Sequence, residues 1–348
     1  MKPSMRLSLL ATWVLLVACV HAPAAGPAAY AVRETYSLTG PGRWDLLAVD
    51  PARHHLFVTR SDHVQVMDTG SGQLLATVDG TDGAHGIALA PPLHRGYVTN
   101  GRGNSVTEFD LDTLQRTRDI PVSGQSPDAV QFDEGTGRVF VMNARSNNAS
   151  VIDPASGREV ATIAFDGNPE LVAGDGRGHL FVNIEDKAEV DDIDTRTFQV
   201  LHRWPLPGCE EPSGLALDSA HARLFSACQN GVMAITDAND GHPVARIAIG
   251  AGPDGAAFDP QAGLAFSPNG KSGTLTLVHE DDPDHFRIVQ TVATEPGART
   301  IALDPISHAL YLPAARFGPK PADPSQRPEM VPESFRILVV GPAQTAPR

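Results

Sequence analysis

The sequence predicts an all-β fold, a seven-bladed β-propeller whose blades are four-stranded antiparallel sheets. First, a six-residue theme recurs seven times along the 348 residues, at steps of about 40 to 45 residues, which is the spacing of propeller blades. Second, three further strand-like runs follow nearly every copy of the theme. Third, 32 glycines and 29 prolines supply more turn-forming residues than a helical protein tolerates.

The recurring theme marks the first strand of each blade. Its copies are LLAVDP (46–51), GIALAP (86–91), AVQFDE (129–134), LVAGDG (171–176), GLALDS (214–219), GAAFDP (255–260) and TIALDP (300–305). A second apolar run follows each copy, as in RGYVTN at 95–100 and RVFVMN at 138–143. A third run usually ends in Asp, where an Asx hydrogen bond favours a turn. A fourth run is present for only six blades.

The missing fourth strand is expected from the other end of the chain. Residues 30–38, YAVRETYSL, alternate between polar and apolar and precede the first theme. We expect them to join the last blade and close the ring, which removes exposed sheet edges. The expected single propeller spans residues 30–341, with a disordered tail at 342–348. A proline-rich insert at 314–333 interrupts the last blade, either as a lid over the channel mouth or as a passive loop.

The second-strand sequence Tyr97-Val98-Thr99-Asn100 appears with companion patterns of the G-x-A-x-D-P and V-I-D kind. Together they resemble the YVTN-repeat β-propeller family, which includes exported YncE-like members. The resemblance covers roughly residues 30–341 and implies the propeller fold. Related propellers serve as binders, surface-layer parts and enzyme subunits, so the resemblance does not specify a function.

The first residues have the pattern of a secretory signal peptide. Lys2 and Arg6 precede an apolar stretch from Leu7 to Ala18 that is too short to span a bilayer comfortably. Two cleavage sites compete. Residues 16–19, LVAC, resemble a lipobox that would end the signal at residue 18 and lipidate Cys19, whereas Ala22-Pro23-Ala24 would end it at residue 24 and leave 25–29 as a linker. We expect an exported, periplasmic protein whose membrane attachment, if any, runs through Cys19.

The net charge limits the kinds of partner that the sequence favours, and the cysteine content predicts a disulfide. Residues 1–19 hold two bases and no acid, so their removal changes the formal net charge from −14 to −16. Such acidity disfavours binding to a phosphate backbone, and nucleic-acid binding is retained only as a second alternative. Cys209 and Cys228 are expected to form a disulfide in an exported chain. They would fix the loop that carries Glu211 beside the channel mouth.

Candidate functional residues follow from blade geometry. Loops that join the fourth strand to the next first strand share a face with loops that join the second and third strands. The candidate ligand-binding residues on that face are Asp45, His85, Asp128, Glu170, Glu211, Asp254, Arg299, Asn100 and Asn143. Carboxylates, a histidine and an arginine around a channel mouth suit a metal ion, a cation or a polar substrate. The competing interpretation is turn and strand-end chemistry that repeats because the blade repeats.

Three functions remain open on this evidence. The favoured one is a ligand- or protein-binding or scaffold module that holds a small polar ligand or a protein partner at the channel mouth. The alternative is a propeller enzyme, a metal-assisted hydrolase, lactonase or isomerase, with a divalent cation in the central channel as its candidate cofactor. The sequence lacks G-x-S-x-G, H-E-x-x-H, a P-loop, G-x-G-x-x-G between a strand and a helix, and C-x-x-C-H. Catalytic residues and metal ligands therefore stay unassigned.

Overall fold

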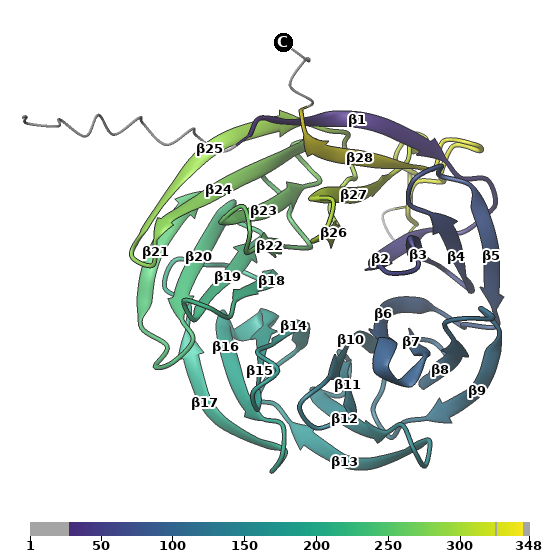
Figure 1. Cartoon of the computed structure of the whole chain (residues 1–348), viewed down its shortest axis with the longest axis horizontal. Coiled ribbons are helices and arrows are strands. Elements are labelled where there is room, and N and C mark those ends of the chain that lie inside the picture. Colours follow the sequence, from purple (N-terminus) through teal and green to yellow (C-terminus); the bar gives the residue numbers. More distant parts are fainter. Residues whose placement is uncertain (1–27, 324–325, 344–348) are drawn as a thin grey trace, which may run out of the picture.

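Seven antiparallel sheets of four strands each surround a common axis (Figure 1). This computed structural model describes residues 28–323 and 326–343. It confirms the predicted fold class, the number of blades and the number of strands in each blade. The predicted signal peptide, Cys19 and most of the predicted tail lie outside the described residues.

The strands follow the repeat in order. Blade one holds β2 (Trp44–Asp50), β3 (His55–Arg60), β4 (His63–Asp68) and β5 (Leu74–Asp79). Blade two holds β6 (Ala84–Ala90), β7 (Arg95–Asn100), β8 (Ser105–Asp110) and β9 (Arg116–Pro121). Blade three holds β10 (Pro127–Asp133), β11 (Arg138–Asn143), β12 (Asn148–Asp153) and β13 (Arg158–Ala164). Blade four holds β14 (Pro169–Gly174), β15 (His179–Ile184), β16 (Glu189–Asp194) and β17 (Gln199–Pro205).

The remaining blades keep the same order, with shorter first strands in the last two. Blade five holds β18 (Pro212–Asp218), β19 (Arg223–Cys228), β20 (Val232–Asp237) and β21 (Pro243–Ala248). Blade six holds β22 (Ala257–Asp259), β23 (Leu264–Asn269), β24 (Thr274–Asp282) and β25 (His285–Ala293). Blade seven holds β26 (Ala302–Asp304), β27 (Ala309–Ala314), β28 (Arg336–Pro342) and β1 (Tyr30–Ser37).

The ring is closed by the two ends of the chain. β1 pairs antiparallel with β28, with Tyr30 opposite Pro342 and Ser37 opposite Arg336 (Figure 1). This confirms closure by the N-terminal strand, and β28 runs one residue past the expected end of the propeller at 341. Since β1 completes the last sheet, every blade has the same four-stranded architecture.

The hydrophobic core lies between neighbouring blades. The second and third strands are buried almost throughout, which explains their nearly continuous apolar runs. Phe57 of blade one and Phe109 of blade two meet with ring centroids 5.6 Å apart. Tyr97 is fully buried and packs in a cluster with Phe132 and Val141 of blade three. The outermost strands alternate between exposed and half-buried residues because one of their faces meets solvent.

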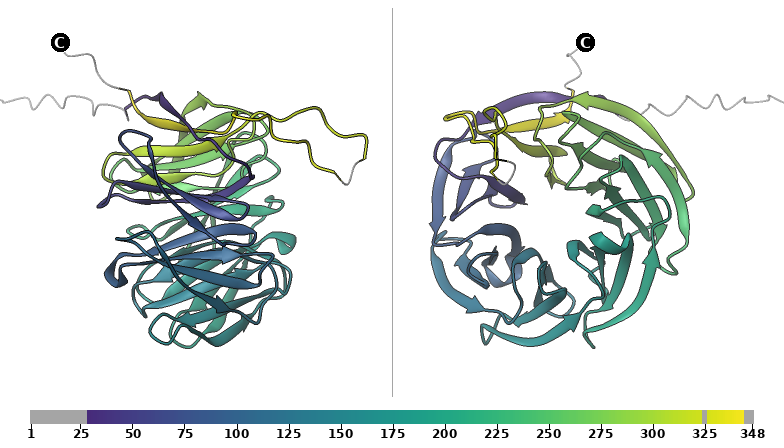
Figure 2. Two further views of the ribbon diagram at one scale, coloured as in Figure 1. Left: turned by 90° about the vertical axis from the view of Figure 1, so that its right-hand side faces the viewer. Right: turned by 180° about the vertical axis from the view of Figure 1, so that it is seen from behind.

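The insert in blade seven joins β27 to β28 and projects beyond the disk of the propeller (Figure 2). Phe317 and Met330 form an isolated bridge between its two arms. The described helices are two three-residue 3₁₀ turns, Pro91–Leu93 and Glu185–Lys187, so no helix in the described part of the chain is long enough to cross a membrane.

Candidate functional site

A break in the register between the first and second strands recurs in blades one to five. In blade one, Trp44 pairs with Arg60, but the next pair is Leu47 with Val58, so a bulge holds Asp45. The same irregularity follows the first bridge in blades two to five. Bulges bend a strand and redirect a side chain, and they are frequent near functional sites. The residues that directly precede the seven copies of the recurring theme, here called the rim ring, are Asp45, His85, Asp128, Glu170, Ser213, Asp254 and Arg299.

Hydrogen bonds between blades fix the backbone of four members of the rim ring. The Thr59 hydroxyl donates to the carbonyl of His85 in the next blade (3.0 Å), and the Thr99 hydroxyl donates to the carbonyl of Asp128 (2.5 Å). Ser213 donates likewise to the Asp254 carbonyl, and Thr300 to the Asp45 carbonyl. We call these bonds the blade latches. They use the carbonyls of the rim residues and therefore leave the side chains of His85, Asp128 and Asp45 to other partners.

One glycine in the rim region is required by close packing. Gly86 follows His85, and a Cβ atom at this position would lie 2.3 Å from the carbonyl oxygen of Asp128. The Gly86 N–H also donates to the Thr99 hydroxyl (2.7 Å). Neighbouring first strands approach this closely only because the side chain is absent.

Five members of the rim ring form one continuous polar chain. His85 Nδ1 lies 2.6 Å from Asp45 Oδ2, and the other oxygen of Asp45 lies 3.6 Å from Arg299 Nη2. Arg299 Nε donates to Asp254 Oδ2 at 2.5 Å. The Ser213 hydroxyl donates to the second oxygen of Asp254 at 2.8 Å. The chain thus runs from blade two through blades one, seven and six to blade five.

The other two members, Asp128 and Glu170, lie outside this polar chain in the described structure. Asp128 Oδ1 lies 3.9 Å from His85 Nδ1, and no described residue makes a hydrogen bond to the Glu170 carboxyl group. Burial, together with the nearby charge of Asp45, raises the pKa of Asp128 to about 7. Burial and the charge of Asp128 raise the pKa of Glu170 to about 9. Burial therefore favours the protonated form of the Glu170 carboxyl group at neutral pH.

The pKa values of the rim residues that have ion-pair partners shift for different reasons. The hydrogen bond that His85 makes to the Asp45 carboxylate raises the pKa of His85, although burial acts against it. Burial raises the pKa of Asp254, and Arg299 only partly offsets this. Burial disfavours the charged Arg299, but Asp254 and Asp45 outweigh it and raise the pKa of the guanidinium group.

One part of the rim ring has the composition of a metal site. Ligand atoms of Asp45, His85 and Asp128 lie within 4.8 Å of one another. Oxygen and imidazole ligands suit divalent ions such as Mn²⁺ or Zn²⁺. The described residues hold two other such groups outside the rim ring, one formed by Asp218, His221 and Glu280 and the other by Asp237, Asp240 and His242.

Three hollows open on the face that carries the rim ring, which we call the mouth face. The first, of about 210 Å³, is lined by Arg43, Trp44, Asp45, Ser61, Gly83, Ala84, His85, Arg102, Arg299, Phe317 and Arg327. The second, of about 420 Å³, shares His85 and Arg102 with the first. The third, of about 360 Å³, shares Arg299 with it and reaches Asp254 and Lys271. The insert thus forms a wall of the first hollow through Phe317 and Arg327.

Three predicted site residues lie apart from the rim ring. Asn100 is 2% exposed and donates within its own blade to Ser105 Oγ and Thr107 Oγ1, both at 2.9 Å. Asn143 is fully buried and donates to Asn148 Oδ1 and Ser150 Oγ. These side chains join the second and third strands of a blade and do not reach the mouth face. The expectation that they face a ligand is not met, because the amide finds its partners inside the sheet.

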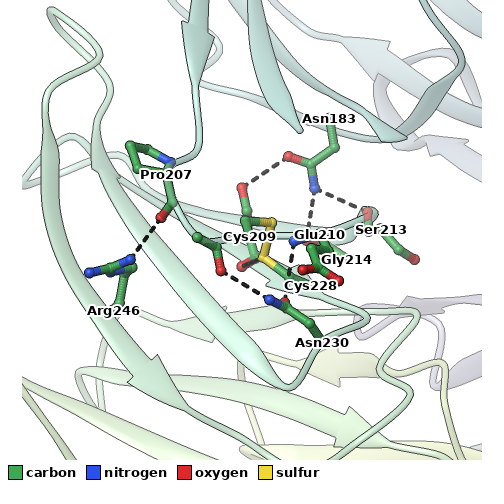
Figure 3. Close-up of a disulfide and its surroundings, with 11 residues drawn as sticks. Asn183, Pro207, Cys209, Glu210, Ser213, Gly214, Cys228, Asn230 and Arg246 are labelled. Atoms are coloured by element: carbon green, nitrogen blue, oxygen red, sulfur yellow. Dashed lines mark hydrogen bonds between the residues drawn. A yellow bond between two sulfur atoms is a disulfide. The ribbon is translucent and has the colours of Figure 1, made fainter. Parts of the chain in front are cut away.

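Glu211 also differs from the expectation. It is exposed with a backbone φ of 49°, and Ser213 occupies the rim position of blade five in its place. The Cys209–Cys228 disulfide is present as predicted, with Cα atoms 5.4 Å apart, and closes the loop that enters blade five (Figure 3). The Asn230 side chain donates to the Gly208 carbonyl in the same loop. The disulfide therefore fixes the entry to β18 and leaves Glu211 in solvent.

The sequence pattern did not identify several residues of the mouth face. Ser213 has a sequence signal, since it precedes GLALDS at the place where His85 precedes GIALAP. Arg102 follows the YVTN stretch by two residues and is one of the arginines that line two hollows. Phe317 and Arg327 have no periodic signal, because the insert occurs in one blade only.

The fold and the rim ring together define a seven-bladed β-propeller with a polar ring and connected hollows on one face. In sequence the chain is similar to YncE proteins. It is 22% identical over 210 residues to the uncharacterized protein YncE of Salmonella typhi and of Salmonella typhimurium, a match that covers 58% of this chain and 59% of each relative. The match thus spans about three fifths of those relatives' length.

A solved structure has the same fold. Hydrazine synthase of Kuenenia stuttgartiensis superposes with a TM-score of 0.70 at 17% identity, covering 79% of this chain and 94% of that chain. At this identity the likeness concerns the fold alone. No family model matches the chain.

Proposed function

We propose that this protein is an exported binding module that holds a small polar ligand at the mouth face. The observation that carries the proposal is the junction of the hollows at His85 and Arg299, two members of the rim ring. Concave surfaces with a few convergent polar groups on a rigid scaffold are the usual form of a small-molecule site. The blade latches supply the rigidity, because they hold the rim backbone independently of any ligand.

Export is supported by two features. The Cys209–Cys228 disulfide suits an oxidising compartment. The first residues also have the pattern of a secretory signal, with either lipidation of Cys19 or soluble cleavage to follow. Mass spectrometry of the protein recovered from an expressing bacterium would distinguish a lipidated Cys19 from an N-terminus at residue 25, and an unprocessed chain would contradict export.

A thermal-shift screen against small polar compounds of both charges tests the binding proposal. We expect a ligand to raise the melting temperature of the wild-type protein and to lose this effect in His85→Ala. His285→Ala is the matched control, because His285 is exposed and pairs with Asp282 in the hairpin between β24 and β25, outside the rim ring. A compound that stabilises both variants equally binds elsewhere and would contradict the site. If no compound raised the melting temperature and a protein bound to the mouth face, the ligand would be a protein partner and not a small molecule.

A second candidate function, metal-assisted hydrolysis or isomerisation, is favoured by the Asp45, His85 and Asp128 group. An ion bound there would supply a Lewis acid and a bound water of lowered pKa. Asp45 would hold the ion with one oxygen while Arg299 remains near the other. Elemental analysis and thermal shifts with Mg²⁺, Ca²⁺, Mn²⁺ and Zn²⁺ test this candidate. It predicts stabilisation that Asp128→Asn removes, and absence of any bound ion at millimolar concentration rejects it.

A further inference from the structure

Basic side chains gather on the mouth face of a protein that is acidic as a whole. The basic residues that line the three hollows, besides His85, are Arg43, Arg102, Arg145, Lys271, Arg299 and Arg327. The carboxylates that line the same hollows are Asp45 and Asp254, and both face Arg299. The local charge is therefore positive although the chain has a formal net charge of −14.

Two of these cations in the first hollow have no carboxylate partner in the described part of the chain. Arg43 donates through Nη2 to the Pro328 carbonyl at 2.5 Å and lies over the Phe317 ring, 4.9 Å from its centroid. Arg327, on the same insert, makes no hydrogen bond with a described residue and is exposed. Burial lowers the pKa of Arg43, and the neighbouring charges of Arg327 and Arg299 lower it further. Guanidinium groups crowded in this way gain from an added anion, which offsets their mutual repulsion.

The same hollow has an aromatic wall. The rings of Trp44 and Phe317 have centroids 5.8 Å apart, and both residues line it. Trp44 is 6% exposed, and its Nε1 has no hydrogen-bond partner among the described residues. A buried indole N–H usually has an acceptor, and in the described part of the chain this one has none.

We propose that the first hollow binds a planar organic anion, with its carboxylate or phosphate held by Arg43 and Arg327 and its ring against Trp44 and Phe317. This inference rests on the proposed small-ligand function and adds the charge and shape of the ligand. The insert takes part as a binding wall, because it supplies Phe317 and Arg327.

Calorimetric titrations with probes of defined charge test the inference. The probes are benzoate, phenyl phosphate, inorganic phosphate and benzylammonium, each at constant ionic strength. We expect benzoate or phenyl phosphate to bind more tightly than both inorganic phosphate and benzylammonium. Arg327→Gln and Arg43→Gln should each weaken that binding about tenfold or more, the loss expected for one charge-assisted hydrogen bond. The relative affinities of benzoate and phenyl phosphate identify the preferred anion.

Arg158→Gln is the matched control, since Arg158 is an exposed arginine at the start of β13 in the outer edge of blade three. The Arg327 side chain is exposed, so Arg327→Gln should fold normally. It therefore tests the inference even if Arg43→Gln does not fold. Equal affinities of all three arginine variants, or the absence of binding by both aromatic anions, would overturn the inference.

The remaining outcomes separate this inference from the broader proposal. Binding of benzylammonium alone, lost in His85→Ala, would overturn the anion site while supporting a small-ligand module. Tight binding of a single-stranded oligonucleotide with steep salt dependence, and of no small anion, would overturn both in favour of nucleic-acid binding.

Discussion

The Thr99 hydroxyl lies 2.5 Å from the carbonyl oxygen of Asp128 and accepts the N–H of Gly86 at 2.7 Å. A single buried side chain in the YVTN stretch therefore joins the first strand of its own blade to the rim of the next blade. Thr59 makes the corresponding bond to the His85 carbonyl. The threonine of the motif is explained by contacts between blades.

Replacement of this threonine should weaken the ring. Thr99→Val keeps the shape but leaves the Gly86 N–H and the Asp128 carbonyl without their partner, so we expect a loss of about 1 to 3 kcal/mol in the free energy of unfolding. Denaturation by urea measures it. Thr81→Val is the control, because the Thr81 hydroxyl is equally buried but has no hydrogen-bond partner among the described residues. A similar loss in both variants would show that the latch contributes nothing specific.

The disulfide should stabilise the entry to blade five. Cys209 and Cys228 are separated by 19 positions in the sequence, and a loop of this size is expected to contribute about 3 kcal/mol. We expect the Cys209→Ser, Cys228→Ser double variant to unfold at lower denaturant concentration, with faster amide exchange around Gly208. Addition of a reductant to the wild-type protein should reproduce the effect. An unchanged midpoint under reducing conditions would contradict it.

Asn100 and His85 should separate stability from binding. Asn100→Ala removes two hydrogen bonds inside blade two, so it should lower stability by about 1 to 3 kcal/mol and leave ligand affinity unchanged. His85→Ala should instead lower ligand affinity and leave stability nearly unchanged, since the His85 side chain contacts Asp45 at the edge of two hollows. Unfolding curves and titrations on both variants measure the contrast. Loss of affinity in Asn100→Ala at a temperature where the variant is folded would place Asn100 in the site.

Glu170 should make stability fall as the pH rises. Its pKa is raised from 4.5 to about 9 in the folded protein, so the folded state binds more protons than the unfolded state between these values. The stability that the protonated group contributes is complete below pH 4.5 and is lost as the pH rises through about 9. Glu170→Gln should therefore be more stable than the wild type at pH 8 and gain little at pH 4.5. Glu134→Gln, at an exposed site, should show no such pH-dependent gain in melting temperature.

Much of the fold was predictable because the repeat is periodic. Seven copies of one theme, each followed by apolar runs of strand length, indicate seven blades, and the missing fourth strand identifies β1 as its replacement. The buried second strands, such as HLFVTR in β3, appear as apolar runs because neighbouring blades cover both of their faces. Cysteines at the two strand ends of one blade lie on one face by the same geometry, so the disulfide was predictable as well.

The candidate site was only partly predictable, because a bulge has no periodicity of its own. Asp45, His85, Asp128, Glu170, Asp254 and Arg299 precede the theme and occupy the rim ring as expected from blade geometry. Asn100 and Asn143 end strands in the same register, but sequence does not tell whether an amide turns outward or toward the next strand. In blade five the acidic residue Glu211 suggested a site residue, whereas Ser213 holds the rim position. The insert occurs in one blade only, so the repeat does not predict its contacts.

The blade latches have a consequence for how the rim ring changes over time. Each latch recognises a backbone carbonyl, which every amino acid has, so the fold places almost no constraint on the side chain at that position. The four rim positions whose carbonyls accept a latch accordingly hold a histidine, His85, and three aspartic acids, Asp45, Asp128 and Asp254. The side chains at these four positions can thus be exchanged without loss of a latch, and a propeller of this kind can acquire a new specificity without first having to find a new architecture.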